Sequence, residues 1–422
     1  MDDRLKPNLT IGVHWSQWRK ILSYEEFPYL ISYDEGLFDP VLSFIVSHLE
    51  RPVSINYKLN KVFGNFFLSI IRSAFPSAKP LFAYNSPPDF FGKDAVGNFV
   101  VYEPYPVLVS FFNEGVIALL HIYCDEEHAE EVNSLFVGGC KAEFGDKVCL
   151  ISGGEGEHTW VDRVAPLPLE EVLKNFPAGV AEDIAVIRRV IDRCFSGQTR
   201  KGVAFLFLGA PGVGKTFLAK ALLDDVLDGD TLGFYISQQQ EATFARLLNS
   251  IKENPGIFDG KKFFFILDDA EWLLLSRKKI SLASPATKTL NILDDLPPKC
   301  VVCFITNLAA ELDTATIRPG RIDLILNIPP SGWGLNVFNY WAEKYQLPER
   351  VVNVVLEDET LRAAVNKLTP AEASSLVSYL QQRDALGFSC TKREIRDAIK
   401  SYTKWRRVYK ERDWEEVEPD VF

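Results

Sequence analysis

The sequence predicts a mixed α/β chain with an α+β region first, then a parallel five-stranded sheet with covering helices, then a helical region. Two observations predict this order. From residue 164 to about 330, continuous apolar runs alternate with helical patterns, which is typical of a parallel sheet covered on both faces. After Pro330 the pattern is helical. We assign residues 1–163 to an N-terminal domain, 164–330 to a sheet domain, 331–412 to a helical lid and 413–422 to an acidic tail.

The N-terminal domain is predicted from a hairpin and a helix. VLVSFFNEGVIALLHIYC has the pattern of two strands joined through Asn113, Glu114 and Gly115, where glycine can supply a positive φ. DEEHAEEVNSLF, which follows, is helical in character. The histidines are scattered and no catalytic constellation occurs here. We therefore expect an α+β domain that binds a substrate or partner.

Composition argues against two classes of protein. The formal net charge is −11, whereas a chain-wide nucleic-acid surface needs clustered lysine and arginine. No stretch reaches the roughly 18 to 20 uninterrupted apolar residues of a membrane helix, and the start, MDDRLKPN, has no signal or transit pattern. The seven cysteines lack a disulfide-scaffold spacing, and Cys300 and Cys303 lie in KCVVCFIT, a buried-strand pattern that predicts core thiols. We expect a cytoplasmic protein without a membrane span.

The sheet domain opens with a linker and continues with strands and helices in alternation. VAPLPLEEVL, with two prolines, is typical of a linker. The predicted strands are GVAFLFLG, TLGFYIS, KKFFFIL, CVVCFIT and LILNIP. In the lid, TPAE from Thr369 and TKRE from Thr391 are capping boxes that predict two helix starts.

A phosphate-binding loop is the strongest motif in the chain. GAPGVGKT fits GxxxxGK[ST] and lies between a predicted strand and a predicted helix. Glycines let backbone N–H groups surround phosphates, Lys215 should reach the β- and γ-phosphates of ATP, and the Thr216 hydroxyl should ligate Mg²⁺. A glycine-rich turn without function is the alternative. The predicted nucleotide-binding residues are Gly209, Ala210, Pro211, Gly212, Val213, Gly214, Lys215, Thr216 and Phe217.

Two adjacent acids end the apolar run FFFILDDA. Asp268 and Asp269 fall at the carboxyl edge of the sheet, where open α/β folds bind ligands. We expect Asp268 to hold Mg²⁺ through water and Asp269 to orient or deprotonate an attacking water. A solvated acidic helix start is the alternative for the pair alone.

Two further elements follow in order: a strand end and an arginine pair. The next strand ends in Thr306 and Asn307, whose amide is predicted to position the same water. Arg318 and Arg321 flank a Pro-Gly turn, which places neither in a helix interior. Such guanidinium groups suit a finger that enters a neighbouring subunit's nucleotide site, although solvated surface arginines are the alternative for either one alone.

Together these motifs resemble the AAA ATPases over about residues 165–412: GAPGVGKT as Walker A, FILDD as Walker B, ITN as sensor 1 and LDTATIRPGRID with paired arginine fingers. PLEEVL, the double acid, the IRPGRID ending and TPAEAS are similar to the Bcs-type members, named for the mitochondrial translocase of the Rieske protein. The resemblance implies a hexameric or heptameric ring, ATP hydrolysis and work on a protein substrate.

The chain departs from the family in three places. Asp269 stands where most members have Glu, SQQQEATFARLL lacks an aromatic-hydrophobic-Gly loop, and the membrane helix of the mitochondrial member is missing. Arg393 resembles the sensor 2 arginine that contacts the γ-phosphate, with a solvated helix face as the alternative. The leading hypothesis is an oligomeric ATPase acting on a protein through its N-terminal domain. The alternatives are a nucleic-acid-associated motor or loader that uses the basic stretch TKREIRDAIKSYTKWRRVYKERD, and a slow nucleotide-gated switch or defence sensor.

Overall fold

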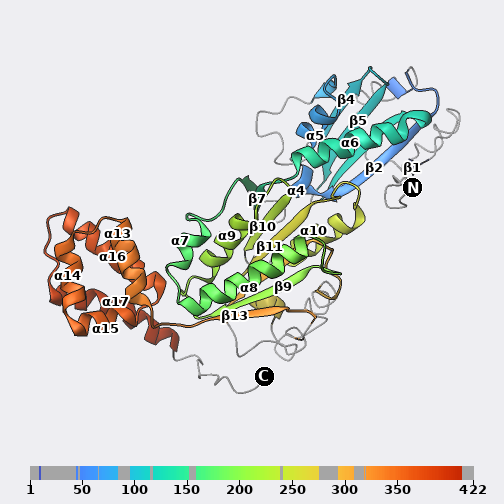
Figure 1. The fold of residues 1–422 in the computed structure, drawn as a ribbon. Helices are drawn as coiled ribbons and strands as arrows, with labels where there is room; N and C mark the ends of the chain where they lie inside the picture. The colour runs from blue at the N-terminus through green and yellow to red at the C-terminus, as the bar shows by residue number, and fades with distance from the viewer. Residues whose placement is uncertain are drawn as a thin grey trace. The chain divides into compact units, whose positions relative to one another are not determined.

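The computed structural model describes most of the chain and divides it into two compact units (Figure 1). The first unit comprises Met1–Trp160, Asp228–Leu232 and Ala242–Lys262, and the second comprises Val161–Leu227, Gly233–Glu241 and Phe263–Phe422. The described residues are 9–10, 44–45, 48–64, 66–83, 96–114, 117–151, 158–237, 241–274, 293–307, 318 and 320–410.

An antiparallel six-stranded sheet forms the core of the first unit, with the order β1-β2-β6-β5-β4-β3. The predicted hairpin is confirmed, because β5 and β6 pair from Leu108 opposite Tyr123 to Glu114 opposite Ile117. Gly115 lies outside the described residues. The strands are β1 (Leu9–Thr10), β2 (Pro52–Asn60), β3 (Lys79–Ala83), β4 (Val96–Val101), β5 (Val107–Glu114) and β6 (Ile117–Asp125).

Two helices of this unit pack on each other, α5 (Phe67–Ala74) and α6 (Ala129–Glu143). Gly139 permits the close approach, since a Cβ there would lie 2.9 Å from the carbonyl oxygen of Ile70. The ring of Tyr57 of β2 packs against that of Phe136 of α6 with centroids 5.0 Å apart and a tilt of 30°, so α6 covers one face of the sheet. The helix predicted after the hairpin is therefore confirmed, preceded by the turn η2 (Glu126–His128); α4 (Lys61–Gly64) follows β2.

The second sheet has the order β13-β9-β12-β11-β10-β7-β8. Its first five strands are the five that the sequence predicts, and the pairs β11–β12, β12–β9 and β9–β13 are parallel. Two additional strands that precede the predicted linker, β7 and β8, extend the sheet to seven. The strands are β7 (Lys147–Ile151), β8 (His158–Val161), β9 (Val203–Gly209), β10 (Thr231–Ser237), β11 (Lys262–Asp268), β12 (Cys300–Thr306) and β13 (Leu324–Ile328).

Helices pack against this sheet because its strands are apolar on both faces. Helix α8 contacts β9, β12 and β13, and α9 contacts β9 and β12. Cys300 and Cys303 of β12 are fully buried, which confirms them as core thiols. The helices between residues 169 and 274 are α7 (Leu169–Leu173), α8 (Ala178–Phe195), α9 (Lys215–Val226), α10 (Glu241–Glu253) and α11 (Glu271–Leu274).

The C-terminal part is helical, as predicted. The Thr369 capping box is present: the Thr369 hydroxyl accepts from the Glu372 N–H at 3.3 Å, and the Glu372 carboxylate accepts from the Thr369 N–H at 2.7 Å. Thr391 and Glu394 form the equivalent pair. None of the helices in the described part of the chain combines the length and the apolar character needed to cross a membrane. The helices are α13 (Gly334–Lys344), α14 (Glu349–Glu357), α15 (Glu359–Asn366), α16 (Pro370–Ala385) and α17 (Lys392–Lys410); the predicted acidic tail lies outside the described residues.

Candidate nucleotide-binding site

The loop GAPGVGKT connects the end of β9 to the start of α9, which is the strand–loop–helix context that the motif requires. Gly212 and Gly214 have φ values of 80° and 94°, a conformation that residues with a side chain rarely adopt. At Gly214 there is also no space, because a Cβ would lie 2.9 Å from the ring of Phe176. The loop therefore depends on glycine at this position for two independent reasons.

Lys215 lies buried beneath the loop, with 6 % of its surface exposed. Its Nζ donates to the carbonyl oxygens of Gly209 at 2.7 Å and Ala210 at 3.0 Å, and to Asn307 Oδ1 at 2.7 Å. Burial lowers the pKa of Lys215 to about 8, although nearby carboxylates, Asp268 foremost, act to raise it. The ammonium group is thus incompletely compensated, and an anion such as a phosphate would stabilise its charged form. Lys215 and the predicted sensor Asn307 belong to one site.

The two predicted acids differ in their surroundings. Asp268 is well partnered: the Thr216 hydroxyl lies 3.0 Å from Oδ2, and the Tyr235 hydroxyl donates to Oδ2 at 2.7 Å. Asp269 is exposed and has a φ of 50°, and its backbone N–H donates to Asp268 Oδ1 at 3.1 Å. Partial burial first, and then the neighbouring carboxylates of Asp268 and Glu271, raise the pKa of Asp269, while Lys215 lowers it. Asp269 is therefore the more accessible carboxylate, and its pKa is raised.

Glu271, in the first turn of α11, connects the acids to the next strand. Its Oε1 accepts from the Thr306 hydroxyl at 3.0 Å and from the Asn307 N–H at 2.7 Å. These bonds fix the end of β12 beside the acid pair. The side-chain oxygen of Asn307 also accepts a hydrogen bond from Lys215 Nζ. Glu271 therefore helps to orient both Asn307 and Lys215.

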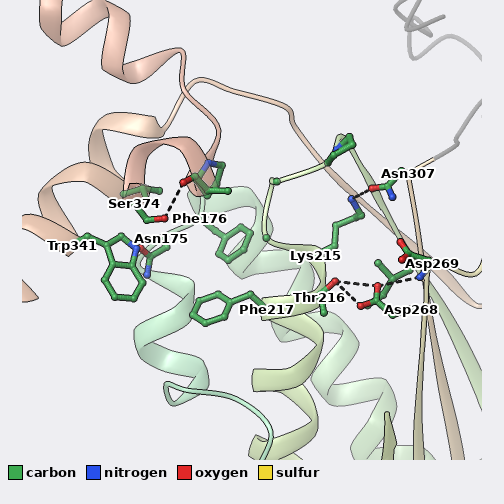
Figure 2. A pocket seen from close by; sticks show the side chains of 17 residues that line it. Asn175, Phe176, Lys215, Thr216, Phe217, Asp268, Asp269, Asn307, Trp341 and Ser374 are labelled. Carbon is green, nitrogen blue, oxygen red and sulfur yellow. Dashed lines mark hydrogen bonds between the residues drawn. The ribbon is translucent and has the colours of Figure 1, made fainter. Parts of the chain in front are cut away.

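One pocket of about 460 Å³ is lined by Lys215, Thr216, Asp268, Asp269 and Asn307 together with further residues (Figure 2). In Figure 2, Lys215, Thr216, Asp268 and Asn307 lie at one end, whereas Asn175, Trp341 and Ser374 lie at the other. Of the predicted residues from Gly209 to Phe217, three do not line the pocket: Gly209 and Ala210 carry the carbonyl oxygens that bind Lys215, and Val213 is fully buried. The lining residues that sequence reasoning missed are Asn175, Phe176, Ile305, Val337, Trp341, Pro370, Ala371 and Ser374.

The part of the pocket wall that was not predicted comes mostly from the residues that follow α7 and from α13 and α16. The Ala371 N–H donates to the carbonyl oxygen of Gly212 at 3.1 Å, which ties α16 to the phosphate loop. Glu171 of α7 accepts from the Tyr340 hydroxyl of α13 at 2.8 Å. The stretches PLEEVL and TPAEAS were the available signals, since both adjoin this wall.

Comparison with known proteins agrees with this geometry. The sequence profile of the family "ATPase family associated with various cellular activities (AAA)" matches residues 205–330. These residues are an AAA domain. They include the phosphate loop, the acid pair, Asn307 and both predicted finger arginines.

Two curated proteins have distant similarity to the chain beyond this profile. It is 27 % identical over 160 residues to the "ATP-dependent zinc metalloprotease YME1 homolog" of Caenorhabditis elegans, covering 35 % of this chain and 21 % of the relative. It is 30 % identical over 203 residues to the "26S proteasome regulatory subunit 4 homolog" of Schizosaccharomyces pombe, covering 42 % and 41 %. The chain therefore spans less than half the length of either relative, and the similarity is limited to part of each protein.

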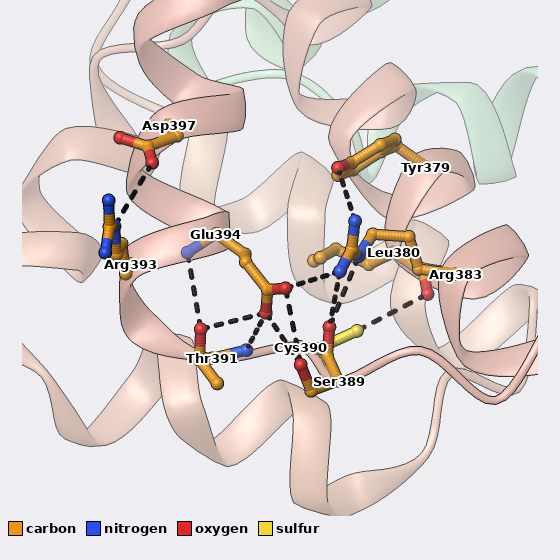
Figure 3. A network of polar contacts seen from close by, with 9 residues as sticks. All are labelled: Tyr379, Leu380, Arg383, Ser389, Cys390, Thr391, Arg393, Glu394 and Asp397. Carbon is orange, nitrogen blue, oxygen red and sulfur yellow. Dashed lines mark hydrogen bonds and ion pairs between the residues drawn. The ribbon is translucent and has the colours of Figure 1, made fainter.

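The predicted arginines lie outside the pocket of the AAA domain. Arg321 forms a bidentate pair with Asp294, with Nε 2.8 Å from Oδ1 and Nη2 2.7 Å from Oδ2. Arg318 is exposed. Arg393 is 92 % exposed on α17 and lies beside Asp397, apart from the network around Glu394 (Figure 3). The roles of Arg318 and Arg321 as fingers in a neighbouring subunit's nucleotide site, and of Arg393 as a γ-phosphate contact, stay predictions.

The donor atoms next to Lys215 fit Mg²⁺. Thr216 and Asp268 offer a hydroxyl and a carboxylate, the hard oxygen ligands that Mg²⁺ accepts while it keeps several waters and substrate phosphates. Among the described residues, there is no cluster of three or more His, Cys, Asp or Glu side chains that could hold a metal alone. A site completed by nucleotide oxygens and water therefore agrees with the side chains present in the AAA domain.

Proposed function

We propose that the chain binds and hydrolyses ATP with Mg²⁺, assembles into a ring, and uses hydrolysis to remodel or move a protein partner. The convergence of Lys215, Thr216, Asp268, Asp269 and Asn307 in one pocket carries this proposal. One cavity then contains the groups that phosphoryl transfer needs: a cation, ligands for a metal ion and side chains that orient a water molecule.

Each side chain has a distinct task in the proposed reaction. Lys215 binds the β- and γ-phosphates, replacing its present carbonyl contacts. Thr216 and Asp268 hold Mg²⁺, which neutralises charge on the phosphate oxygens. Asp269, with its raised pKa, orients the attacking water and accepts its proton, while Asn307 positions the same water. Glu271 keeps Asn307 in place through the bond at 2.7 Å.

Several observations support the ring and the protein partner. Arg318 and Arg321 do not line their own chain's pocket, as fingers that act on a neighbouring subunit require. The names of the two relatives describe a protease and a proteasome regulatory subunit, and the double acid with TPAEAS is similar to Bcs-type proteins. The first unit, with its antiparallel sheet, is the proposed partner-binding part. The free thiols of all seven cysteines support a reducing compartment, the cytoplasm.

A slow nucleotide-gated switch is the second candidate. It is favoured by Asp269, which is one methylene shorter than Glu, and by the Asp294 carboxylate that holds Arg321 within its own chain. Nucleotide-dependent assembly with negligible phosphate release would select the switch over the remodelling ATPase.

Mixing two inactive chains tests the ring. An Arg318→Ala, Arg321→Ala chain keeps its pocket but lacks fingers, and a Lys215→Ala chain has the reverse defect. In mixed rings the second chain presents fingers to the first chain's pocket, so phosphate release should exceed that of either parent. Loss of the fingers alone should cost roughly 10³- to 10⁵-fold in rate.

The control is Arg362→Ala, which removes an exposed arginine on α15 and should keep wild-type turnover. Light scattering confirms assembly, and a labelled chain confirms subunit exchange. If exchange occurs and no mixture exceeds its parents, the trans-acting fingers are wrong.

A further inference from the structure

Asn175 holds a buried hydrogen-bond acceptor that has no partner. The residue follows α7 and is 3 % exposed. Its Nδ2 donates to the carbonyl oxygen of Glu171 at 3.1 Å, whereas no hydrogen bond reaches Oδ1 among the described residues. An unsatisfied buried acceptor is destabilising, and such groups in folded proteins call for an explanation. Asn175 lines the pocket, so a ligand there can supply the missing donor.

The orientation of this amide is fixed by its neighbour. Exchanging Oδ1 and Nδ2 would place two acceptors, Oδ1 and the carbonyl oxygen of Glu171, against each other. Glu171 is itself held, because its carboxylate accepts from Tyr340 at 2.8 Å. The unpaired atom of Asn175 is therefore Oδ1, which can accept a hydrogen bond, and not Nδ2, which already donates to Glu171.

The surroundings of Asn175 suit a nucleobase. Phe176 and Trp341 line the pocket here, and Trp341 stacks on Tyr345 with ring centroids 5.2 Å apart. Figure 2 shows Asn175 and Trp341 at the end away from Lys215. With the phosphates of a nucleotide at Lys215, the base falls between flat, largely apolar walls.

We propose that Asn175 Oδ1 selects adenine over guanine by accepting an N–H from the 6-amino group. Guanine has an oxygen acceptor at the same position, and two acceptors facing each other in a buried site repel. The inference rests on the proposed nucleotide-binding function and goes beyond it by naming the residue that distinguishes the two purines.

Equilibrium binding of nucleoside diphosphates with Mg²⁺ tests the assignment without hydrolysis. Wild-type protein is titrated with ADP, GDP, purine riboside diphosphate, which carries hydrogen at the 6-position, and 2′-deoxy-ADP. ADP and 2′-deoxy-ADP should bind alike, and the other two about tenfold to a hundredfold more weakly. This series needs no variant, so it stands even if a substitution at Asn175 impairs folding.

Asn175→Leu removes the acceptor while keeping a side chain branched at Cγ, and it should lower the affinity for ADP to that for purine riboside diphosphate, which itself should change little. Asn336→Leu makes the same exchange on the exposed face of α13 and should preserve the wild-type order. Three results would each overturn the assignment. The wild-type protein could bind ADP and purine riboside diphosphate equally well. Asn175→Leu could lose the same affinity for every nucleotide, or the loss of affinity could depend on the 2′-hydroxyl instead of the 6-amino group. If wild-type protein binds none of the four, the proposed function itself fails.

Discussion

Glu271 is expected to act as a positioning residue for Asn307, and two substitutions separate this role from that of a general base. Glu271→Ala leaves the Asn307 N–H without the acceptor it now has at 2.7 Å and removes the Thr306 contact at 3.0 Å. The free energy of unfolding should fall by about 1–3 kcal/mol. Phosphate release should fall by at least about tenfold, because Asn307 loses its fixed orientation.

Glu271→Gln keeps an oxygen at the same reach and changes only the charge. Both donors keep an acceptor, so unfolding should change by less than about 1.5 kcal/mol and turnover by no more than about threefold. Urea unfolding and phosphate release are measured on all three proteins. If Glu271→Gln loses as much turnover as Glu271→Ala at wild-type stability, the carboxylate takes a proton and the positioning role is refuted.

Three other predictions concern charged groups. Lys215→Ala should nearly abolish nucleotide binding, because the phosphates lose their buried cation; wild-type affinity by calorimetry would contradict the loop assignment. Asp268→Ala should weaken Mg²⁺-dependent binding as well as turnover, whereas Asp269→Asn should bind ATP normally and release no phosphate, and normal turnover in Asp269→Asn would assign the base elsewhere. Burial lowers the pKa of His121 from 6.5 to about 4. As the pH falls from 6.5 to 4, this histidine is therefore protonated in the unfolded chain before it is protonated in the folded one. The free energy of unfolding should fall by up to about 3 kcal/mol over that range. His121→Gln should flatten that fall in urea midpoints between pH 7 and pH 4.5, and an unchanged pH dependence would show that other groups cause it.

The phosphate end of the site could be predicted from sequence because its chemistry is local. Eight consecutive residues set the loop, and the two acids directly follow a strand that had to be buried. Parallel strands bring their carboxyl ends to one edge, so Asn307 could be placed with them from its position alone. The covering helices of the lid were also predictable, since the capping boxes at Thr369 and Thr391 are short-range patterns.

The base end could not be predicted in the same way. Asn175, Trp341 and Ser374 meet only through tertiary packing, and no short pattern distinguishes an asparagine with an unpaired oxygen from one on a surface loop. Strands β7 and β8 present a related difficulty: a short strand pattern does not reveal which of two sheets it joins. Likewise, the bidentate pair of Arg321 with Asp294 joins residues that no spacing rule connects.

The bond between Ala371 and Gly212 has a consequence for the folding of the second unit. The pocket is closed by stretches from Asn175 to Ser374, so it exists only when helices and sheet of this unit are folded together. By thermodynamic linkage, a nucleotide present at a hundred times its dissociation constant adds about 2.7 kcal/mol to the free energy of global unfolding. That gain protects α16 and the loop jointly, and loss of the nucleotide should therefore raise the susceptibility of both segments to proteolysis together.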